Sequence, residues 1–221
     1  MPRIWFITGT DTDVGKTVLT LLLARVLESR GASYVALKPF CSGGRNDAEQ
    51  LYRVQEKRLT LDQINPWHYS QPVTPAWAAR SSGKKVVCKD VLGWVRGIRP
   101  RPEHLLIEGA GGLLSPLGED FGARELIVGL RAIPLVVCRN RLGAINQARL
   151  VFTALPSGSA ARARLILMDP PEPDCSTGSN PEVLAQFLGG HRIHRLPWLS
   201  MGPWQSMAPD LQERVLNLLD P

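Results

Sequence analysis

The sequence is poor in cysteine and has no long apolar run. Its four cysteines are Cys41, Cys88, Cys138 and Cys175. They form no CxxC pair and have no histidine at metal-ligand spacing, which favours reduced thiols over a disulfide framework or a zinc site. The longest apolar stretch, residues 18–27, is interrupted by Thr20 and Arg25 and is too short to span a membrane. The N-terminal residues do not resemble a signal peptide, so we expect a cytoplasmic protein with no membrane partner.

Lysine is also scarce, and the basic residues form no long run. The net charge of +6 comes mainly from 20 arginines, against only 6 lysines. The excess lies in residues 1–100, with 15 basic and 8 acidic residues, whereas residues 101–221 have 11 and 12. The densest basic segment, residues 96–101, contains a proline and no aromatic residue. We interpret it as a solvated loop and expect no nucleic-acid partner.

What the sequence does contain is enough apolar residues for a sizeable core. A length of 221 residues with 44% hydrophobic content predicts one globular domain, residues 1–221. Short β-rich runs alternate with longer helical patterns, which predicts an α/β fold, a mostly parallel sheet with helices on both faces. The predicted strands are Ile4–Thr8, Ser33–Leu37, His104–Ile107, Ile133–Cys138, Arg164–Met168 and Arg192–Leu196. The predicted helices are Lys16–Arg30, Asp47–Arg58, Ala76–Arg80, Val91–Arg96, Ala144–Leu155 and Pro181–Leu188, the last with Asn180 as N-cap.

A glycine-containing turn, GTDTDVGKT from Gly9 to Thr17, follows the first strand and opens the first helix. In a P-loop NTPase this position holds the phosphates, because turn amides and the positive end of the helix dipole converge there. Lys16 adds a charge, and Thr17 can offer its hydroxyl to Mg²⁺. Thr10 stands where the usual motif has its first glycine, so the loop is a variant. The turn predicts nucleotide binding and a fold of the P-loop NTPase type.

Three charged residues lie near the ends of the second and third predicted strands. Lys38 follows the second strand, and Glu108 ends the third before the glycine-rich segment 109–112. Asp47 lies downstream of Lys38. Lys38 suits an anionic partner, and the two carboxylates could share Mg²⁺ with Thr17. Each residue also has an ordinary interpretation. Lys38 could be a solvated lysine, Glu108 could cap a turn, and Asp47 could be a helix N-cap.

Other features carry less information. The turn Gly143–Asn146 opens a helix and could receive a carboxylate at its free amides, although on sequence alone it is ordinary. The histidines are His68, His104, His191 and His194. They form no triad with a serine or cysteine, and a GxSxG motif is missing, which argues against nucleophilic hydrolysis.

Taken together, these pieces resemble the dethiobiotin synthetase family. The matching segments, in the family's order, are Gly9–Thr17, Lys38-Pro39 with Ser42-Gly43, Asn46-Asp47-Ala48, Asn65-Pro66, Glu108–Gly112, Leu142–Asn146 and Leu196–Leu199. The resemblance implies an enzyme of biotin synthesis, a homodimer that binds Mg-ATP, CO₂ and 7,8-diaminopelargonic acid. In the family's chemistry a substrate amine takes up CO₂ as a carbamate, ATP phosphorylates the carbamate, and the second amine closes the ring and expels phosphate.

The resemblance also implies a role for individual residues. By this resemblance, the residues that contact the carbamate and the γ-phosphate are Thr12, Lys16, Lys38 and Ser42. The Mg²⁺ ligands are Thr17, Asp47 and Glu108. The rest of the nucleotide site comprises Asp13, Val14, Gly15, Asp169 and Pro197. The rest of the substrate site comprises Gly111 and, across the dimer interface, Leu142, Gly143 and Asn146, which bind the substrate carboxylate.

Two departures from the family pattern bear on the nucleotide. The loop between Lys38 and Asp47 is short, and Met168-Asp169 stands where the family often has Asn-Asp, whose asparagine reads adenine. A carboxylate only accepts hydrogen bonds, so we expect relaxed base selection, with CTP or GTP also used. The alternative is that backbone groups in residues 170–173 or 197–202 read adenine.

Two other functions remain possible from the sequence. A partitioning or regulatory P-loop ATPase that acts as a dimerisation switch has a second, signature lysine early in the loop, where this chain has Asp11. A cobyrinate-type amidoligase usually adds a glutaminase domain, for which 221 residues leave no room.

Overall fold

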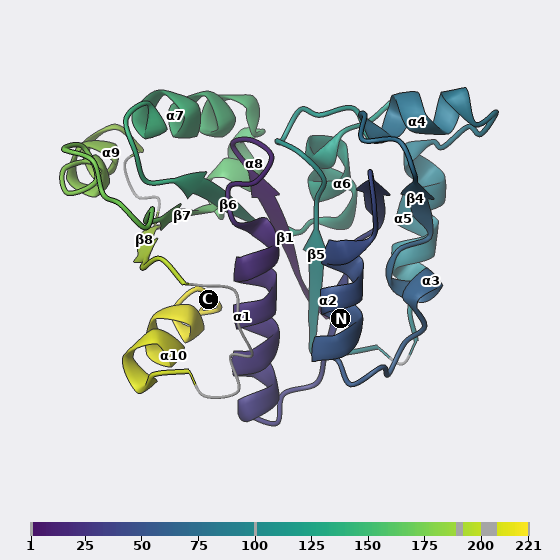
Figure 1. The fold of residues 1–221 in the computed structure, drawn as a ribbon, viewed down its shortest axis with the longest axis horizontal. Helices are drawn as coiled ribbons and strands as arrows, with labels where there is room; N and C mark the ends of the chain where they lie inside the picture. The colour runs from purple at the N-terminus through teal and green to yellow at the C-terminus, as the bar shows by residue number, and fades with distance from the viewer. Residues whose placement is uncertain (1, 100, 189–191, 200–206, 221) are drawn as a thin grey trace.

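A computed structural model of the chain describes residues 2–99, 101–188, 192–199 and 207–220. Its main element is a six-stranded sheet in the order β2-β5-β1-β6-β7-β8, in which every neighbouring pair is parallel (Figure 1). The strands are β1 (Arg3–Gly9), β2 (Tyr34–Leu37), β5 (His104–Glu108), β6 (Ile133–Arg139), β7 (Arg164–Met168) and β8 (Arg192–Leu196). The predicted fold class and all six predicted strands are therefore confirmed. A small parallel pair, β3 (Phe40–Ser42) with β4 (Trp67–Tyr69), was not predicted because each strand has only three residues.

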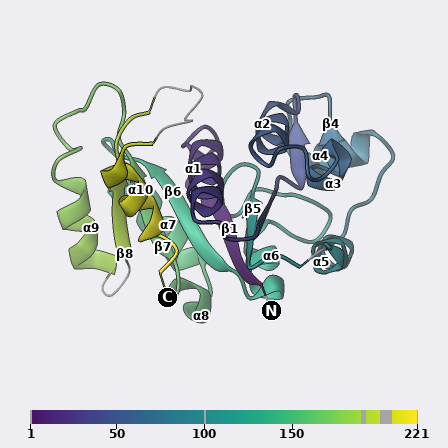
Figure 2. The same cartoon turned by 90° about the horizontal axis from the view of Figure 1, so that it is seen from below.

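Helices cover both faces of the large sheet. One face packs against α1 (Lys16–Ser29), α2 (Asn46–Val54), α3 (Leu61–Ile64) and α10 (Pro209–Leu216). The apolar cluster of the other face includes residues of α4 (Pro75–Ser81), α5 (Cys88–Gly97), α6 (Ala123–Leu130), α7 (Ala144–Ala154), α8 (Ser157–Ala160) and α9 (Asn180–Leu188). Figure 2 shows α1 and α10 on one side of the sheet and α6 and α8 on the other. None of the described helices is long and apolar enough to cross a membrane.

The central strand β1 shows why the sheet needs both layers. Trp5 and Ile7 are fully buried in the cluster beneath α1, whereas Phe6, between them, is buried in the cluster on the opposite face. Successive side chains of a strand point to opposite faces, so a strand that is apolar throughout must be covered on both. The continuous apolar runs in the sequence thus position the helices.

Several helix boundaries differ from the predictions. The helix predicted to end at Arg58 ends at Val54, because Glu56 and Lys57 adopt positive φ angles of 52° and 61°, which a helix cannot contain. Asn180 is not a side-chain N-cap. It begins α9 itself, and its amide group donates to Asn140 and to the carbonyl of Arg141.

Four helices, α3, α6, α8 and α10, were not predicted. Two of them have only one turn, too short for a periodic pattern. In α6 the initiation signal is Glu125, whose carboxylate accepts a hydrogen bond from the backbone N–H of Gly122 at 2.8 Å. At the end of α1, by contrast, the termination signal is Gly31, which has a φ of 66°.

At β2, the outermost strand on one side of the sheet, a side chain closes the edge. The carboxamide of Gln55 accepts from the backbone N–H of Ala36 at 2.8 Å and donates to the carbonyl of the same residue at 2.9 Å. Both residues are buried. Gln55 therefore satisfies the two groups that a further strand would bind, and keeps this edge from pairing with another chain.

We expect Gln55→Ala to lower the free energy of unfolding by about 1–3 kcal/mol, because it leaves buried polar groups of Ala36 without partners. Urea unfolding monitored by circular dichroism measures this change. Gln50→Ala, in the helix α2 that Gln55 follows, is the matched control, since no hydrogen bond is formed by the Gln50 side chain in the described structure. Equal midpoints for the two variants would contradict the role given to Gln55.

Candidate functional site

The predicted phosphate loop connects the end of β1 to the start of α1. Gly15 immediately precedes the helix with a φ of 103°, a left-handed conformation that favours glycine. Gly9 is needed for a different reason. A Cβ atom at this position would lie 2.7 Å from the Val14 side chain and 2.9 Å from the carbonyl oxygen of Asp11. The close turn that a usual P-loop makes at its first glycine is thus made here by the residue before Thr10.

Lys16, the first residue of α1, points back over this loop. Its Nζ donates to the carbonyl oxygen of Asp11 at 2.7 Å, and the side chain is almost fully buried. Burial, and then the nearby cation of Lys38, lower the pKa of Lys16 to about 8. A cation held in such surroundings is stabilised by an incoming anion, which suits a phosphate site.

Lys38, just after β2, is the centre of a buried charge cluster. Its Nζ lies 2.6 Å from Oε1 of Glu108, 2.9 Å from Oδ2 of Asp47 and 3.1 Å from the carbonyl oxygen of Gly109. Burial alone would lower its pKa, but Glu108 and Asp47 outweigh this effect and raise the pKa of Lys38 above its ordinary value. The structure thus brings together three residues that the sequence placed on separate segments.

Thr17 joins the same cluster from the first turn of α1. Its hydroxyl donates to Oε1 of Glu108 at 2.7 Å. Burial opposes ionisation of Asp47, but Lys38 and Thr17 outweigh it and lower the pKa of this carboxyl. Asp47 is in the first turn of α2, where no side-chain N-cap bond is formed, so its main partner is Lys38 rather than the helix.

The cluster has the oxygen donors that a hard cation prefers. Oε2 of Glu108 is buried and has no hydrogen-bond partner among the described residues, so a ligand position remains open on this carboxylate. No group of three or more His, Cys, Asp or Glu side chains suited to a metal occurs in the described residues. Two carboxylates and one hydroxyl nevertheless fit Mg²⁺, which takes few protein ligands and completes its shell with phosphate and water.

A cavity of about 670 Å³ opens over the cluster. The predicted site residues that line it are Thr12, Asp13, Gly15, Lys16, Thr17, Lys38, Ser42, Asp47, Glu108 and Gly111. The hydroxyl of Ser42 is buried without a described hydrogen-bond partner, which leaves it available to a ligand. Val14 lies beneath the loop, buried against Gly9. The cavity therefore unites the predicted phosphate contacts and the predicted Mg²⁺ ligands.

Sequence reasoning missed part of this site. Residues 72–75 also line the cavity, and no chemical motif marks them. Asn65, fully buried, donates to the carbonyl oxygen of Lys38 at 2.7 Å and accepts from Arg45 at 3.0 Å. It thereby holds the turn that carries Lys38 against the segment that leads to Asp47. The segment Asn65-Pro66 did contribute to the family resemblance, but its role was invisible without the fold.

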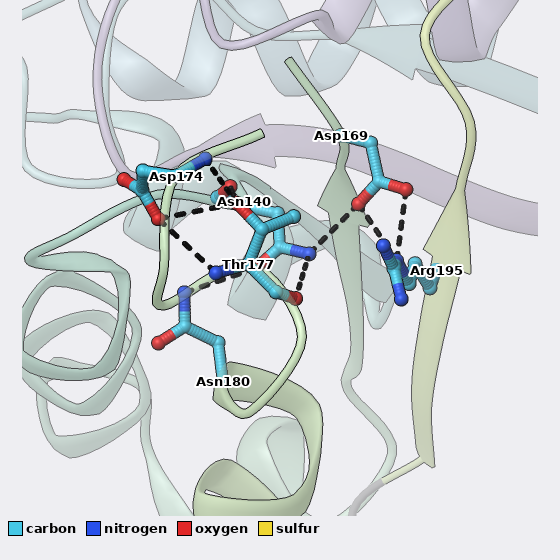
Figure 3. Close-up of polar contacts among 6 residues, drawn as sticks. All are labelled: Asn140, Asp169, Asp174, Thr177, Asn180 and Arg195. Carbon is cyan, nitrogen blue, oxygen red and sulfur yellow. Dashed lines mark hydrogen bonds and ion pairs between the residues drawn. The ribbon is translucent and has the colours of Figure 1, made fainter. Parts of the chain in front are cut away.

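A second polar network lies where β6, β7 and β8 end (Figure 3). The Asp169 carboxylate accepts from Nε of Arg195 at 2.8 Å and from the buried amide of Asn140 at 2.7 Å. Asn140 also donates to the carbonyl of Thr177, and the Thr177 hydroxyl donates back to the carbonyl of Asn140. Asp169, predicted to contact the nucleotide base, thus already has two protein partners.

The remaining predicted residues do not line the cavity of the same chain. Leu142 is 81% exposed, and its backbone N–H donates to Asp174 at 2.8 Å. Gly143, with a φ of 93°, and the exposed Asn146 lie at the start of α7. Pro197 is exposed just after β8, and residues 200–202 of the alternative adenine-reading loop lie outside the described residues.

Solved structures of other proteins share this fold. A putative plasmid partition protein of Borrelia burgdorferi B31, bound to AMPPNP, superposes with a TM-score of 0.61 at 13% identity, over 99% of this chain and 96% of that one. The MinD cell division protein of Aquifex aeolicus gives a TM-score of 0.56 at 16% identity, over 98% and 86% of the two chains. At these identities the likeness establishes the fold alone.

Sequence comparison is more specific. Residues 3–204 match the AAA domain family. ATP-dependent dethiobiotin synthetase BioD of Bacillus subtilis (strain 168) is 33% identical over 98% of this chain and 93% of its own length. The proteins of the same name from Anaeromyxobacter sp. (strain K) and Rhodococcus erythropolis (strain PR4) are 35% and 36% identical, over 96% and 95% of this chain and 94% and 92% of theirs. With near full-length relatives at this identity, the chain belongs to the dethiobiotin synthetase family.

Proposed function

We propose that this protein is an ATP-dependent dethiobiotin synthetase, a ligase that carboxylates 7,8-diaminopelargonic acid and closes the ureido ring to give dethiobiotin, ADP and phosphate. The observation that supports this most is the cavity in which Lys16 and Lys38 face the same space from two different strand ends. An ATP-dependent carboxylation must hold a carbamate anion beside a γ-phosphate. Two cations, turn amides and buried hydroxyls provide that environment, while the reaction needs little acid–base chemistry from the protein.

The proposed roles follow from where each group lies. Lys16 and the amides of Asp13, Gly15 and Thr17 hold the phosphate chain. Lys38 stabilises the negative charge that develops when the carbamate oxygen bonds to the γ-phosphorus and the bond to ADP breaks. Thr12, Ser42 and Gly111 line the space on the substrate side, where the diamine and its carbamate are placed. The second amine then attacks the phosphorylated carbamate carbon, and inorganic phosphate leaves.

Mg²⁺ is the proposed metal, with Thr17, Asp47 and Glu108 as the residues that would hold it. When bound, the ion supplies positive charge to the transferring phosphoryl group. In the structure the Lys38 ammonium bridges Asp47 and Glu108. The two carboxylates are therefore already paired with a cation. When Mg²⁺ binds, Lys38 has to share them with the metal, or release one of them to contact the anionic ligands.

We also propose that the enzyme works as a homodimer. The turn Leu142–Asn146 does not line the cavity of its own chain, so it binds the substrate carboxylate only if it belongs to a second copy. Three leucines are largely exposed. Leu142 belongs to this turn, Leu150 to the helix that follows it, and Leu114 lines a surface cavity together with Leu150; their exposures are 81%, 62% and 62%. Their burial between two copies would stabilise such a dimer. The side chain of Asp174 already accepts a hydrogen bond from the N–H of Leu142, so other backbone amides of the turn must bind the substrate carboxylate.

The alternative function, a partitioning ATPase that acts as a dimerisation switch, has less support. Its signature lysine is absent, since Asp11 occupies that position. The likeness to partition proteins rests on the fold, which hosts many functions. The cavity of about 670 Å³ next to the phosphate loop indicates a small-molecule substrate instead.

Base selection is proposed to be relaxed. The Asp169 carboxylate is shared between Asn140 and Arg195, so it has little capacity left to accept from a base. Met168 does not replace the adenine-reading asparagine either. Its side chain packs against the phosphate loop, 3.1 Å from where a Cβ of Gly15 would lie. Affinity should therefore come mainly from the phosphates.

Turnover of 7,8-diaminopelargonate with bicarbonate and Mg²⁺, assayed with each of the four nucleoside triphosphates, tests both claims. We expect dethiobiotin and phosphate in equal amounts, with initial rates for CTP or GTP within about tenfold of ATP, which corresponds to about 1.4 kcal/mol. A preference for ATP above about 100-fold would refute relaxed base selection only. The absence of dethiobiotin with all four would refute the proposed function.

Conservative changes of the carboxylates test the metal site. In Asp47→Asn and Glu108→Gln we expect the Mg²⁺ concentration for half-maximal turnover to rise at least about tenfold, because each loses an anionic ligand. Binding of diaminopelargonate without nucleotide should change less. Glu49→Gln, a change of a half-buried carboxylate in the same turn of α2 that pairs with Arg53 instead of Lys38, is the matched control. An unchanged Mg²⁺ requirement in both variants would show that these carboxylates only support Lys38.

A further inference from the structure

A second large cavity lies at the opposite edge of the sheet from the reaction site. It has a volume of about 630 Å³ and is bounded by the beginnings of β1, β5 and β6 and by the last residues of α5 and α6. The phosphate loop and Lys38 follow the other ends of strands, and Glu108 is the last residue of β5. In Figure 1 this edge is the lower one, where β1 begins. The two cavities share no lining residue, so the second one is not part of the site already described.

The charge of this cavity is entirely of one sign. Five arginines line it, namely Arg3, Arg96, Arg101, Arg131 and Arg162, and no acidic residue does. None of the five forms an ion pair within the described part of the chain. Each guanidinium has five N–H donors and no acceptor. The cavity therefore offers many donors and positive charge to an anion.

Packing of the helix ends accounts for only some of these arginines. Arg96 donates to the carbonyl of Gly129, Arg162 to those of Gly158 and Arg131, and Arg3 to that of Leu219. Such contacts are ordinary, because cations favour the carbonyl ends of helices. Arg101 and the side chain of Arg131 are different, since neither forms a side-chain hydrogen bond or ion pair with any described residue.

The backbone of Arg131 makes this position more unusual. Arg131 is the C-cap of α6, with a φ of 52°, in the left-handed region where helices most often end on glycine. An arginine there costs more than glycine would, and its guanidinium gains no partner within the described chain. The Arg131 side chain is exposed at the cavity, as is that of Arg101, so the donors of both are accessible to a ligand.

The other walls of the cavity are apolar. Their apolar residues are Ile4, Val95, Ile98, Leu105, Leu130 and Ile133. A site for a metal ion or free phosphate would be polar throughout, whereas sites for small organic molecules are mostly apolar with a few orienting charges, in volumes of about 300–1,000 Å³. The apolar walls, the arginine rim and the volume together fit a small organic anion with an apolar body.

We propose that this cavity binds a small amphipathic anion, whose apolar body lies against the residues from β1, β5 and β6 and whose carboxylate, phosphate or sulfonate group is held by Arg101 and Arg131. Such a ligand would bind where the strands of the sheet begin, whereas the reaction takes place where they end. The proposal is independent of the function proposed above, because it uses none of the residues of the reaction site.

Fluorescence titration with 8-anilinonaphthalene-1-sulfonate, an anionic aromatic probe, tests the proposal. We expect Arg101→Gln/Arg131→Gln to weaken probe binding at least tenfold, because the two guanidinium groups without partners are lost. The variant should keep the wild-type Tm, since these side chains make no described polar contact. Arg124→Gln, at the opposite end of α6, is the matched control and should bind the probe within twofold of wild type.

Two further experiments separate the contribution of the ligand's charge from that of its apolar body. N-phenyl-1-naphthylamine has the same aromatic body without the sulfonate and should bind at least tenfold more weakly than the anionic probe. Octanoate should displace the anionic probe, and inorganic phosphate at the same concentration should not. The proposal is overturned if the double variant binds like wild type, if Arg124→Gln loses as much affinity, if the uncharged probe binds equally well, or if phosphate competes as effectively as octanoate.

Discussion

The ammonium group of Lys38, held between Glu108 and Asp47, connects the fold to the chemistry. It ties the end of β2, the end of β5 and the first turn of α2 to one buried point. Glu108 has no exposed surface, and a buried carboxylate without a cation would be strongly destabilising. Asn65 fixes the turn that carries Lys38, so the position of the cation depends on the backbone as well as on its partners.

This arrangement supports the proposal that the site binds two anions. The phosphate loop alone supplies one cation, Lys16, whose pKa is lowered by burial and by Lys38. Like charges this close are tolerated because the carboxylates lie beside them, and an incoming phosphate or carbamate relieves the remaining repulsion. At the far edge of the sheet the arginine-lined cavity has no such carboxylates, and its charge is left for a ligand.

Much of this site could be predicted from the sequence, because its chemistry follows strand ends. The turn Gly9–Thr17, Lys38 and Glu108 each come directly after an apolar strand, and parallel strands bring such positions to one edge. The contributions of Asn65 and Gln55 could not be predicted, because they bind backbone groups 27 and 19 residues away that only the folded chain brings close. The role proposed for the exposed Leu142 would depend on a second chain, about which the pattern of one chain says little.

The account depends on Lys38 as the cation that stabilises the transferring phosphoryl group, and turnover of Lys38→Gln tests it most directly. The assay is dethiobiotin formation at saturating substrates, on protein whose circular dichroism and ADP affinity match those of wild type. Loss of one preorganised donor predicts a fall in kcat of about 100-fold or more. A folded Lys38→Gln protein with near-normal kcat would contradict the account, because the reaction would then not depend on this cation.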